Sequence, residues 1–532
     1  MLLLIFMTTL VSLLTVDNVK SANILVAMPV SFYSHHSGVQ PVLHALAARG
    51  HNVTILSPYP QKKPVANITD IIVPNFFQNF IAKNAPKDDF LSFHGITSIM
   101  FAIWELGANT LGVALQDDQI QKLIKSNDDT KFDLIMAETL FANELFVAFG
   151  HKFKAPVVNL FPALLFPSGA YLTGNDFPPS YVPVVRTSFS DRMTFWERVQ
   201  NTFFYWWDIF IGHVYYLKLQ ENLLQKYFVY PGSENRPPLE DMLRNTSLTL
   251  VDLHFSIGYP TPMHKNIVPY GGGYLKAPGK LPKDLQDLMD NAREGIIYLS
   301  FGSGTTLSSL RPELQRAVLS ALSKVKQTVL MRLQEPTLPQ EFRNKNIIVR
   351  DWFPQAAILA HPNCKLFITH CGLHGIMEAV QYAVPMVATP LIADQHYNSL
   401  FLESAGIAYR VPPQEISEQK LSLAIRTVLT DPKYKENIKT RSAIFKDNPM
   451  DMMDNAIYWI EYVIRHKGAP HLRPAVLDLY WYQRLMLDVI AFYLLLIFLI
   501  VYILVKIIRL FFKLITWMCC SKVSKNKKSK KE

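Results

Sequence analysis

The run from Phe367 to Gln395 constrains the fold of this 532-residue chain more than any other stretch. An apolar segment over 366–369 is expected to form a strand, which breaks at His370-Cys371-Gly372 and restarts as a helix at Gly375. A strand that ends in glycines and leads into a helix presents free backbone N–H groups and a positive dipole end to an anion. The run therefore predicts a strand–turn–helix unit of an α/β sheet, with an anion site at the turn.

Polar side chains along the same run add candidate ligand contacts. His370, at the tip of the strand, can donate a hydrogen bond to a phosphate, and Glu378 can reach a ribose hydroxyl from the start of the helix. A second apolar strand, Pro385–Pro390, leads to Asp394-Gln395, a polar pair suited to sugar hydroxyls. One glycine after a strand is usually only a turn. Together, however, these residues suit a diphosphate, a ribose and a sugar.

This run resembles the signature of the UDP-glycosyltransferase family. The spacing fits throughout, at His370, Gly372, Gly375, Glu378, Pro385, Pro390, Asp394 and Gln395. Two positions near the phosphate site differ from the family pattern. Cys371 stands where glycine is usual and is small enough to be tolerated, while His374 stands where asparagine or glutamine is common and can still donate a hydrogen bond.

The two ends of the chain predict a membrane protein, in agreement with a hydrophobic content of 49% and a mean hydropathy of +0.12. The apolar run Leu2–Val16 and the small residue before Ala22 predict a signal peptide over 1–21, with a signal anchor as the alternative. The uncharged run Val489–Val505 predicts a transmembrane helix over 487–507. Aromatic residues precede this run and basic residues follow it, which favours a cytosolic tail over 508–532.

The positive charge of the chain is concentrated in this tail. From Lys506 onward the chain carries nine Lys or Arg and one acidic residue, so the tail accounts for most of the net charge of +10. The body is nearly neutral, which argues against a nucleic-acid partner, whereas a basic tail beside a bilayer attracts anionic lipid. Lys528 and Lys530, fifth and third from the end, resemble the dilysine retrieval signal of endoplasmic reticulum proteins. A generic stop-transfer tail is the alternative.

These ends place the body in the lumen of the endoplasmic reticulum, as a single-pass type I protein. Three glycosylation sequons then become relevant, at Asn52, Asn67 and Asn245. The four cysteines form no disulfide framework, and no cysteine–histidine set has the spacing of a zinc site. The oligomeric state stays open, with a homo-oligomer among the alternatives.

Two series of apolar runs separated by helical stretches predict two parallel α/β domains. The domains are expected over 22–260 and 261–480, with a Pro- and Gly-containing linker over 254–282. The resemblance implies the GT-B fold, in which two Rossmann-like domains face each other across a cleft. The expected strands are 23–29, 53–57, 132–137, 156–160, 296–300, 329–332, 347–349, 366–369 and 385–388. The expected helices are 39–49, 144–152, 312–324, 355–360, 375–381, 417–429 and 451–465.

Other residues of the second domain match the family's donor site. The resemblance implies that Trp352 stacks on uracil and that Gln355 contacts the nucleoside. Ser300, Gly302 and Ser303 end a strand near the diphosphate, and Arg332 ends the next strand. Helix N–H groups and His370 would stabilise the departing UDP in place of a cation. No metal and no cofactor is therefore expected.

The first domain supplies the expected catalytic base. The resemblance assigns this role to the histidine of a Ser-His pair after the first strand, which is Ser34-His35 here, with His36 as the competing candidate. Glu138 stands where the family usually has an aspartate that orients the base, and Asp133 lies too early in the same strand. The implied reaction is a single displacement, so an α-linked donor gives a β-glycoside.

The expected function is transfer of a hexose from a UDP-sugar to a small lipophilic acceptor, as in detoxification. The Ser-His turn with Glu138 resembles invertebrate members, which favours glucose over glucuronic acid as the sugar. A sphingolipid- or sterol-directed transferase and a non-catalytic binding protein are the alternatives. Aromatic residues at 203–207, with Phe76, Phe77 and Phe93, are expected either to line the acceptor pocket or to lie in the core or on the bilayer.

Overall fold

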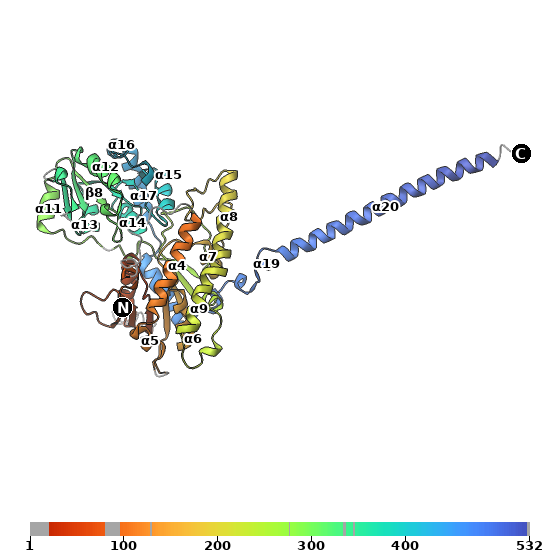
Figure 1. Cartoon of the computed structure of the whole chain (residues 1–532), viewed down its shortest axis with the longest axis horizontal. Coiled ribbons are helices and arrows are strands. Elements are labelled where there is room, and N and C mark those ends of the chain that lie inside the picture. Colours follow the sequence, from red (N-terminus) through yellow and green to blue (C-terminus); the bar gives the residue numbers. More distant parts are fainter. Residues whose placement is uncertain are drawn as a thin grey trace, which may run out of the picture. The chain divides into compact units, whose positions relative to one another are not determined.

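The computed structural model describes residues 21–79, 96–127, 130–275, 277–333, 337–343 and 346–528 (Figure 1). The chain divides into a compact body, Met1–Pro474, and a C-terminal unit, Ala475–Glu532. The predicted signal peptide lies outside the described residues except for Ser21, and so do the last four residues of the tail.

The first half of the body is built on a parallel sheet of seven described strands in the order β3-β2-β1-β4-β5-β6-β7. The strand order reverses between β1 and β4, and ligands of such sheets bind at the carboxyl ends of the strands at this point. The strands are β1 (Asn23–Ala27), β2 (Asn52–Ser57), β3 (Ile68–Ile72), β4 (Leu134–Glu138), β5 (Val157–Phe161), β6 (Leu248–Val251) and β7 (Ile267–Pro269).

The second half repeats this design with six described parallel strands in the order β10-β9-β8-β11-β12-β13. Its order reverses between β8 and β11. The strands are β8 (Ile296–Ser300), β9 (Thr328–Arg332), β10 (Ile347–Arg350), β11 (Cys364–Thr369), β12 (Met386–Ala388) and β13 (Ala408–Arg410). All nine predicted strands are confirmed to within two residues at each end, whereas β3, β6, β7 and β13 were not predicted.

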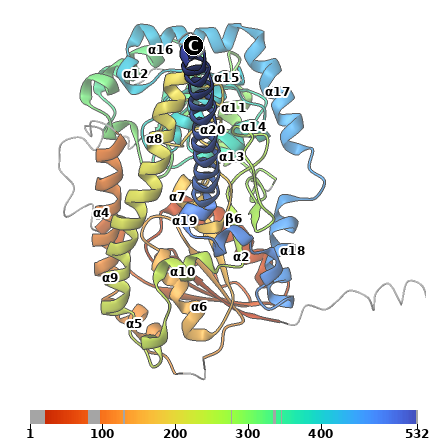
Figure 2. The same cartoon turned by 90° about the vertical axis from the view of Figure 1, so that its right-hand side faces the viewer.

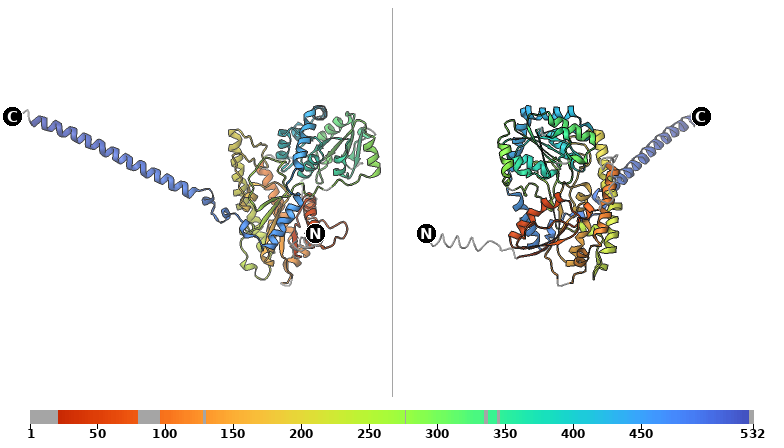
Figure 3. Two further views of the ribbon diagram at one scale, coloured as in Figure 1. Left: turned by 180° about the vertical axis from the view of Figure 1, so that it is seen from behind. Right: turned by 60° about the vertical axis from the view of Figure 1, so that its left-hand side comes forward.

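Helices cover both faces of each sheet (Figure 3). We call the two halves of the body the first and the second lobe. The helices of the first lobe include α2 (Tyr33–Ala48), α5 (Asp118–Ile124), η2 (Glu144–Val147), α6 (Ala148–Phe153), α7 (Pro167–Thr173), η4 (Ser233–Asn235) and α10 (Leu239–Arg244). The second lobe contains α11 (Lys283–Asp290), η5 (Leu307–Ser309), α12 (Pro312–Ser323), η7 (Gln340–Phe342), α13 (Gln355–Ala360), α14 (Leu373–Gln381), α15 (Gln395–Ser404), η8 (Pro413–Glu415), α16 (Glu418–Thr430) and α17 (Pro432–Lys446).

The first lobe extends past the predicted boundary at residue 260. Strand β7 lies inside the segment predicted as a linker and pairs with β6, so the sheet continues to Pro269. Helix α18 (Met452–Arg465), from the end of the body, also packs on this sheet, and Arg49 Nε donates to its Glu461 Oε1 at 2.7 Å. A strand of three residues among prolines and glycines carries no periodic pattern, and a helix pattern does not reveal which lobe the helix covers.

Three long helices stand beside the first sheet, namely α4 (Ile96–Ala114), α8 (Phe195–Ile211) and α9 (Lys218–Tyr227). Figure 2 shows α8 and α9 end to end, with α4 beside them. A π-helical segment, η3 (Gly212–Leu217), joins α8 to α9, and its Tyr216 packs with Trp104 of α4.

The C-terminal unit consists mainly of one helix, α20 (Leu487–Lys528), preceded by η10 (Ala475–Asp478) and α19 (Trp481–Arg484); η9 (Pro470–Leu472) ends the body. Its Leu487–Met518 segment is long and apolar enough to cross a membrane, by length and composition, and none of it is buried. The helix begins where the predicted span begins, at Leu487, and continues through the span into the basic tail.

Candidate functional site

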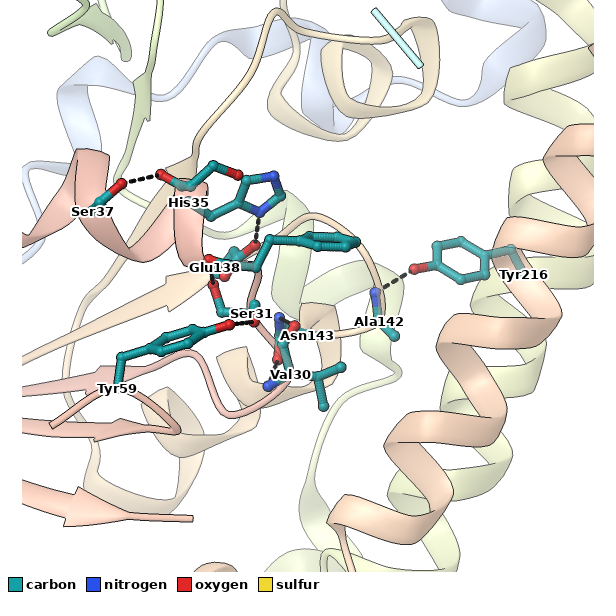
Figure 4. A network of polar contacts seen from close by, with 11 residues as sticks. Val30, Ser31, His35, Ser37, Tyr59, Glu138, Ala142, Asn143 and Tyr216 are labelled. Carbon is teal, nitrogen blue, oxygen red and sulfur yellow. Dashed lines mark hydrogen bonds and ion pairs between the residues drawn. The ribbon is translucent and has the colours of Figure 1, made fainter. Parts of the chain in front are cut away.

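The structure brings His35 and Glu138 together at the point where the strand order of the first sheet reverses (Figure 4). His35 lies in the first turn of α2, directly after β1, and Glu138 ends the neighbouring strand β4. The distance from His35 Nδ1 to Glu138 Oε1 is 2.7 Å, and the Glu138 side chain is 0% exposed. With Nδ1–H donating to the carboxylate, Nε2 carries the lone pair that a general base needs.

The turn that carries His35 is held by a side chain that sequence reasoning missed. Val30 N donates to Asn143 Oδ1 at 3.1 Å, and Asn143 Nδ2 donates to Val30 O at 2.7 Å. Tyr59 Oη donates to Ser31 O at 3.2 Å (Figure 4). Asn143 is fully buried, so both bonds lie in a dry environment where they are strong. These contacts position the base rather than take part in the chemistry.

Neither of the competing residues reaches this site. His36 is 2% exposed and packs against the ring of Tyr59. Burial lowers its pKa to about 4, although the charge of Asp70 acts to raise it. Asp133 Oδ2 accepts a hydrogen bond from Asn23 N at 2.8 Å, at the opposite end of the strand from Glu138. His35 is therefore the histidine of this turn that is arranged as a base.

An aromatic cluster adjoins His35 through Phe32. Phe32 lies 5.0 Å from the His35 ring, and the rings of Phe77 and Phe141 lie 4.5 Å and 4.8 Å from Phe32. Phe77 was named from the sequence as a candidate for the acceptor pocket, whereas Phe32 and Phe141 were not. The other candidates lie elsewhere: Phe76 is buried, Phe93 is outside the described residues, and the 203–207 run belongs to α8.

In the second lobe, His370 follows β11 and lies between two glycines. A Cβ atom at Gly302 would lie 2.7 Å from His370 Nε2, and one at Gly372 would lie 2.5 Å from it, so any larger residue would displace the ring. Burial lowers the pKa of His370 to about 4, which keeps the ring neutral. Ser300 Oγ accepts from Gly302 N at 3.3 Å, and Ser303 is exposed in the same loop. The loop after β8 and the turn after β11 thus meet at His370.

Cys371 shows why its position usually holds glycine. Its φ of 67° lies in the left-handed region that a residue with a side chain rarely adopts. Asn398 Nδ2 stabilises this conformation by donating to Cys371 O at 3.0 Å and also to Asp394 Oδ2 at 2.8 Å. Gln395, a predicted sugar contact, accepts through Oε1 from the backbone N–H groups of Leu391 and Ile392. This oxygen therefore stabilises the loop before α15.

The predicted nucleoside contacts lie beside one another. Trp352 is 59% exposed, and the Arg332 guanidinium lies 5.4 Å from its ring centre while also donating to Gly302 O. Gln355, the first residue of α13, donates through Nε2 to Glu378 Oε2. Burial raises the pKa of Glu378, although the hydrogen bond from Gln355 opposes this change.

His374 connects the two lobes. Its Nε2 lies 2.7 Å from Oδ2 of Asp252, which follows β6 of the first sheet and is 0% exposed. Burial lowers the pKa of His374, but the charge and hydrogen bond of Asp252 outweigh burial, so the pKa is raised. Gly38 of α2 permits the approach, since a Cβ there would lie 2.8 Å from the His374 ring. Asp252 was missed, although an acidic residue directly after a strand is a usable signal.

The predicted glycosylation sites Asn52, Asn67 and Asn245 are all exposed. Asn52 Nδ2 donates to Asn23 Oδ1 at 3.0 Å, and Asn67 Nδ2 donates to Ala47 O at 3.1 Å. Asn245 ends α10.

The two Rossmann-like lobes have the architecture of the GT-B fold. A solved UDP-glucosyltransferase from Polygonum tinctorium matches with a TM-score of 0.56 at 16% identity, over 84% of this chain and 99% of that one. The family model for UDP-glucoronosyl and UDP-glucosyl transferase matches residues 23–523. The chain belongs to this family and is a glycosyltransferase.

Two curated relatives agree with this assignment. UDP-glycosyltransferase UGT4 of Dactylopius coccus is 35% identical over 95% of this chain and 97% of its own length. UDP-glucuronosyltransferase 2B33 of Macaca mulatta is 33% identical over 89% of this chain and 90% of its own length.

Proposed function

We propose that the chain transfers a hexose from a UDP-sugar to a hydroxyl of a small lipophilic acceptor, with inversion at the anomeric carbon and glucose as the favoured sugar. The observation that carries the proposal is the contact of 2.7 Å between His35 Nδ1 and the buried carboxylate of Glu138. A buried carboxylate on Nδ1 leaves Nε2 as the base and stabilises the imidazolium that forms.

The reaction is a single displacement. Nε2 of His35 removes the proton of the acceptor hydroxyl as its oxygen attacks the anomeric carbon. The new carbon–oxygen bond forms while the bond from that carbon to the β-phosphate oxygen breaks, and UDP leaves with the electron pair. Phe32, Phe77 and Phe141 beside His35 offer an apolar surface to a flat acceptor.

The second lobe supplies the donor site in this proposal. The exposed Trp352 gives a flat surface for the uracil ring, and Glu378 faces the ribose. The diphosphate lies at the turn around His370, Gly302 and Gly372, where the N-terminus of α14 directs backbone N–H groups toward it. Ser303, Asp394 and Gln395 complete the set. We propose that the backbone N–H groups, His370 and Ser303, rather than a metal ion, stabilise the UDP that leaves.

We further propose that the enzyme is anchored in the endoplasmic reticulum membrane by α20, with the body lumenal and the basic tail cytosolic. The apolar Leu487–Met518 segment supports the anchor. The proposed orientation would expose the three sequons to glycosylation.

The proposal is tested with the full chain in microsomes, given labelled UDP-glucose or UDP-glucuronic acid and a panel of phenols and alcohols. We expect β-glucosides, identified by mass spectrometry and by the anomeric proton coupling in NMR. Chelation of divalent metals with EDTA should leave the rate unchanged. UDP binding without any product would contradict catalysis, an α-glycoside would contradict the single displacement, and loss of activity with EDTA would contradict the metal-free donor site.

A further inference from the structure

Helix α8 presents its apolar residues to the outside. Trp196 is 69% exposed, Phe210 62% and Phe203 54%. At about 100° per residue, the exposed apolar residues of α8 and the start of η3 fall on one stripe about 100° wide, which contains no Lys, Arg, Asp or Glu. His213 lies at the margin of the stripe, where its Nδ1 is 3.3 Å from Glu240 Oε2. The stripe consists of Phe195, Trp196, Val199, Phe203, Trp206, Phe210 and Val214. A helix on a water-facing surface normally has the opposite arrangement.

The inward face of the same helix carries buried polar side chains. Asn201 is fully buried, and its Oδ1 accepts from Val184 N at 2.8 Å while its Nδ2 donates to Val182 O at 2.8 Å. Asp208 is also buried, and it accepts from Ser168 N at 2.8 Å and pairs with Arg186 at 3.3 Å. The polar groups thus make their bonds inside the protein, and the aromatic groups are left outside.

We propose that this stripe lies in the lipid–water interface of the membrane, as a second contact between the body and the bilayer. The inference rests on the proposed anchoring by α20. Trp and Phe on an uncharged helix face are the residues that bury in the boundary between headgroups and acyl chains. A 17-residue helix offers a stripe about 25 Å long to that boundary.

The short connection to α20 keeps the body near the bilayer. Only residues 475–486 separate the body from the apolar span, and at 3.3–3.6 Å per residue they reach at most about 40 Å. Exposed Tyr480, Trp481 and Tyr482 precede the span and suit the same interface. A body tethered by so short a segment has a membrane surface within reach.

The stripe is joined to the acceptor side of the site by continuous structure. Helix α8 leads directly into η3, where Tyr216 Oη accepts from Ala142 N at 2.7 Å (Figure 4). Ala142 follows Phe141, one of the aromatic residues around His35. The lipid contact therefore lies on the element that positions the acceptor-side loop.

The test uses the full chain in single-protein phosphatidylcholine nanodiscs, with Cys519 and Cys520 replaced by serine. The fluorophore NBD is attached at F203C on the stripe or, as the matched control, at L423C, an exposed apolar position on α16 of the other lobe. A third label at I500C reports on α20. Brominated lipids then quench whichever label lies in the bilayer.

We expect several-fold stronger quenching at F203C than at L423C, with I500C also quenched. Equal quenching at F203C and L423C would overturn the proposal. If F203C is shielded from water but not quenched by brominated lipid, the stripe is covered by protein, either a second copy or another segment of this chain, and the proposal is wrong. Absence of quenching at I500C would instead contradict the anchor, and the rate of glucoside formation reports separately on the proposed catalysis.

Discussion

Among the histidine–carboxylate pairs of the described body, two have the same contact distance of 2.7 Å but different origins. His35 and Glu138 both belong to the first lobe, and their 2.7 Å contact follows from the pairing of β1 with β4. His374 and Asp252 also lie 2.7 Å apart, but they come from different lobes. The first pair is a product of local sheet topology, whereas the second exists only when the lobes are packed together.

Both histidines affect the pKa of a third residue, Asp394. Burial raises the pKa of Asp394, and the charges of His35 and His374 oppose this change along with a hydrogen bond from Asn398. Asp394, which is predicted to bind the sugar, therefore interacts electrostatically with both histidines. We therefore expect the first pair to control turnover. We expect the second pair to hold the lobes together and so to affect binding of the donor.

The largest effect is expected from removing the base. H35A should lower kcat by about 10²- to 10⁴-fold, because the acceptor hydroxyl loses its general base, while UDP binding is retained. Steady-state kinetics and calorimetric UDP titration measure the two quantities. H44A, on the same helix, is the control and should keep its turnover. An equal loss of turnover and UDP binding in H35A would remove the case for a base.

A smaller loss of turnover is expected from neutralising the partner of the base. E138Q should lower kcat by about 10- to 100-fold, because the ring loses the charge that selects its tautomer and stabilises the imidazolium. The matched control is E144Q in the adjoining η2 turn. Burial raises the pKa of Glu144 to about 7, and the hydrogen bond that Gln220 Nε2 donates to it can be kept by the amide oxygen of a glutamine. Equal kcat values for the two variants would contradict the assigned role of Glu138.

The second pair should act on stability with a defined pH dependence. His374 has a raised pKa, so its pairing with Asp252 contributes fully below the usual histidine pKa of about 6.5 and is lost as pH rises through the higher folded value. Glu378 and Asp394 also face His374 and act in the same direction. D252N should therefore destabilise the body by about 1–2 kcal/mol at pH 6 and by less at pH 9.

Urea unfolding of the full chain in detergent measures this difference, with D133N, directly before β4 of the same sheet, as the control. A destabilisation by D252N that grows from pH 6 to pH 9 would show that the interlobe pair does not depend on a protonated His374.

The smallest effect is expected from crowding the interlobe contact. The Cβ in G38A would lie 2.8 Å from the His374 ring, so the lobes must separate slightly even though alanine favours the helix. The KM for the UDP-sugar should rise a few-fold with little change in kcat. G304A, where nothing lies within 4 Å, is the matched control. An unchanged KM in G38A would mean that donor binding does not require the His374–Asp252 contact.

The residues of the first pair and of the proposed donor site could be named from the sequence, because each lies at or after a strand and matches a family motif. His35 after β1, Glu138 at the end of β4 and the 370–395 run each follow a strand that an apolar run reveals. Asp252 follows β6, which was not predicted, and its partner lies in the other lobe. Asn143 and Asn398, which hold the two turns, have no pattern that separates them from other polar residues.

The sequence by itself determined the family, the two α/β series, the apolar C-terminal helix and the identity of the residues at the strand ends, because these depend on local periodicity and spacing. Only the tertiary structure decided that β7 and α18 complete the first lobe, that His374 pairs with Asp252, and that α8 turns its aromatic side outward. Each of these depends on packing between segments distant in the chain, and the free energy of such packing has no local signature in the sequence.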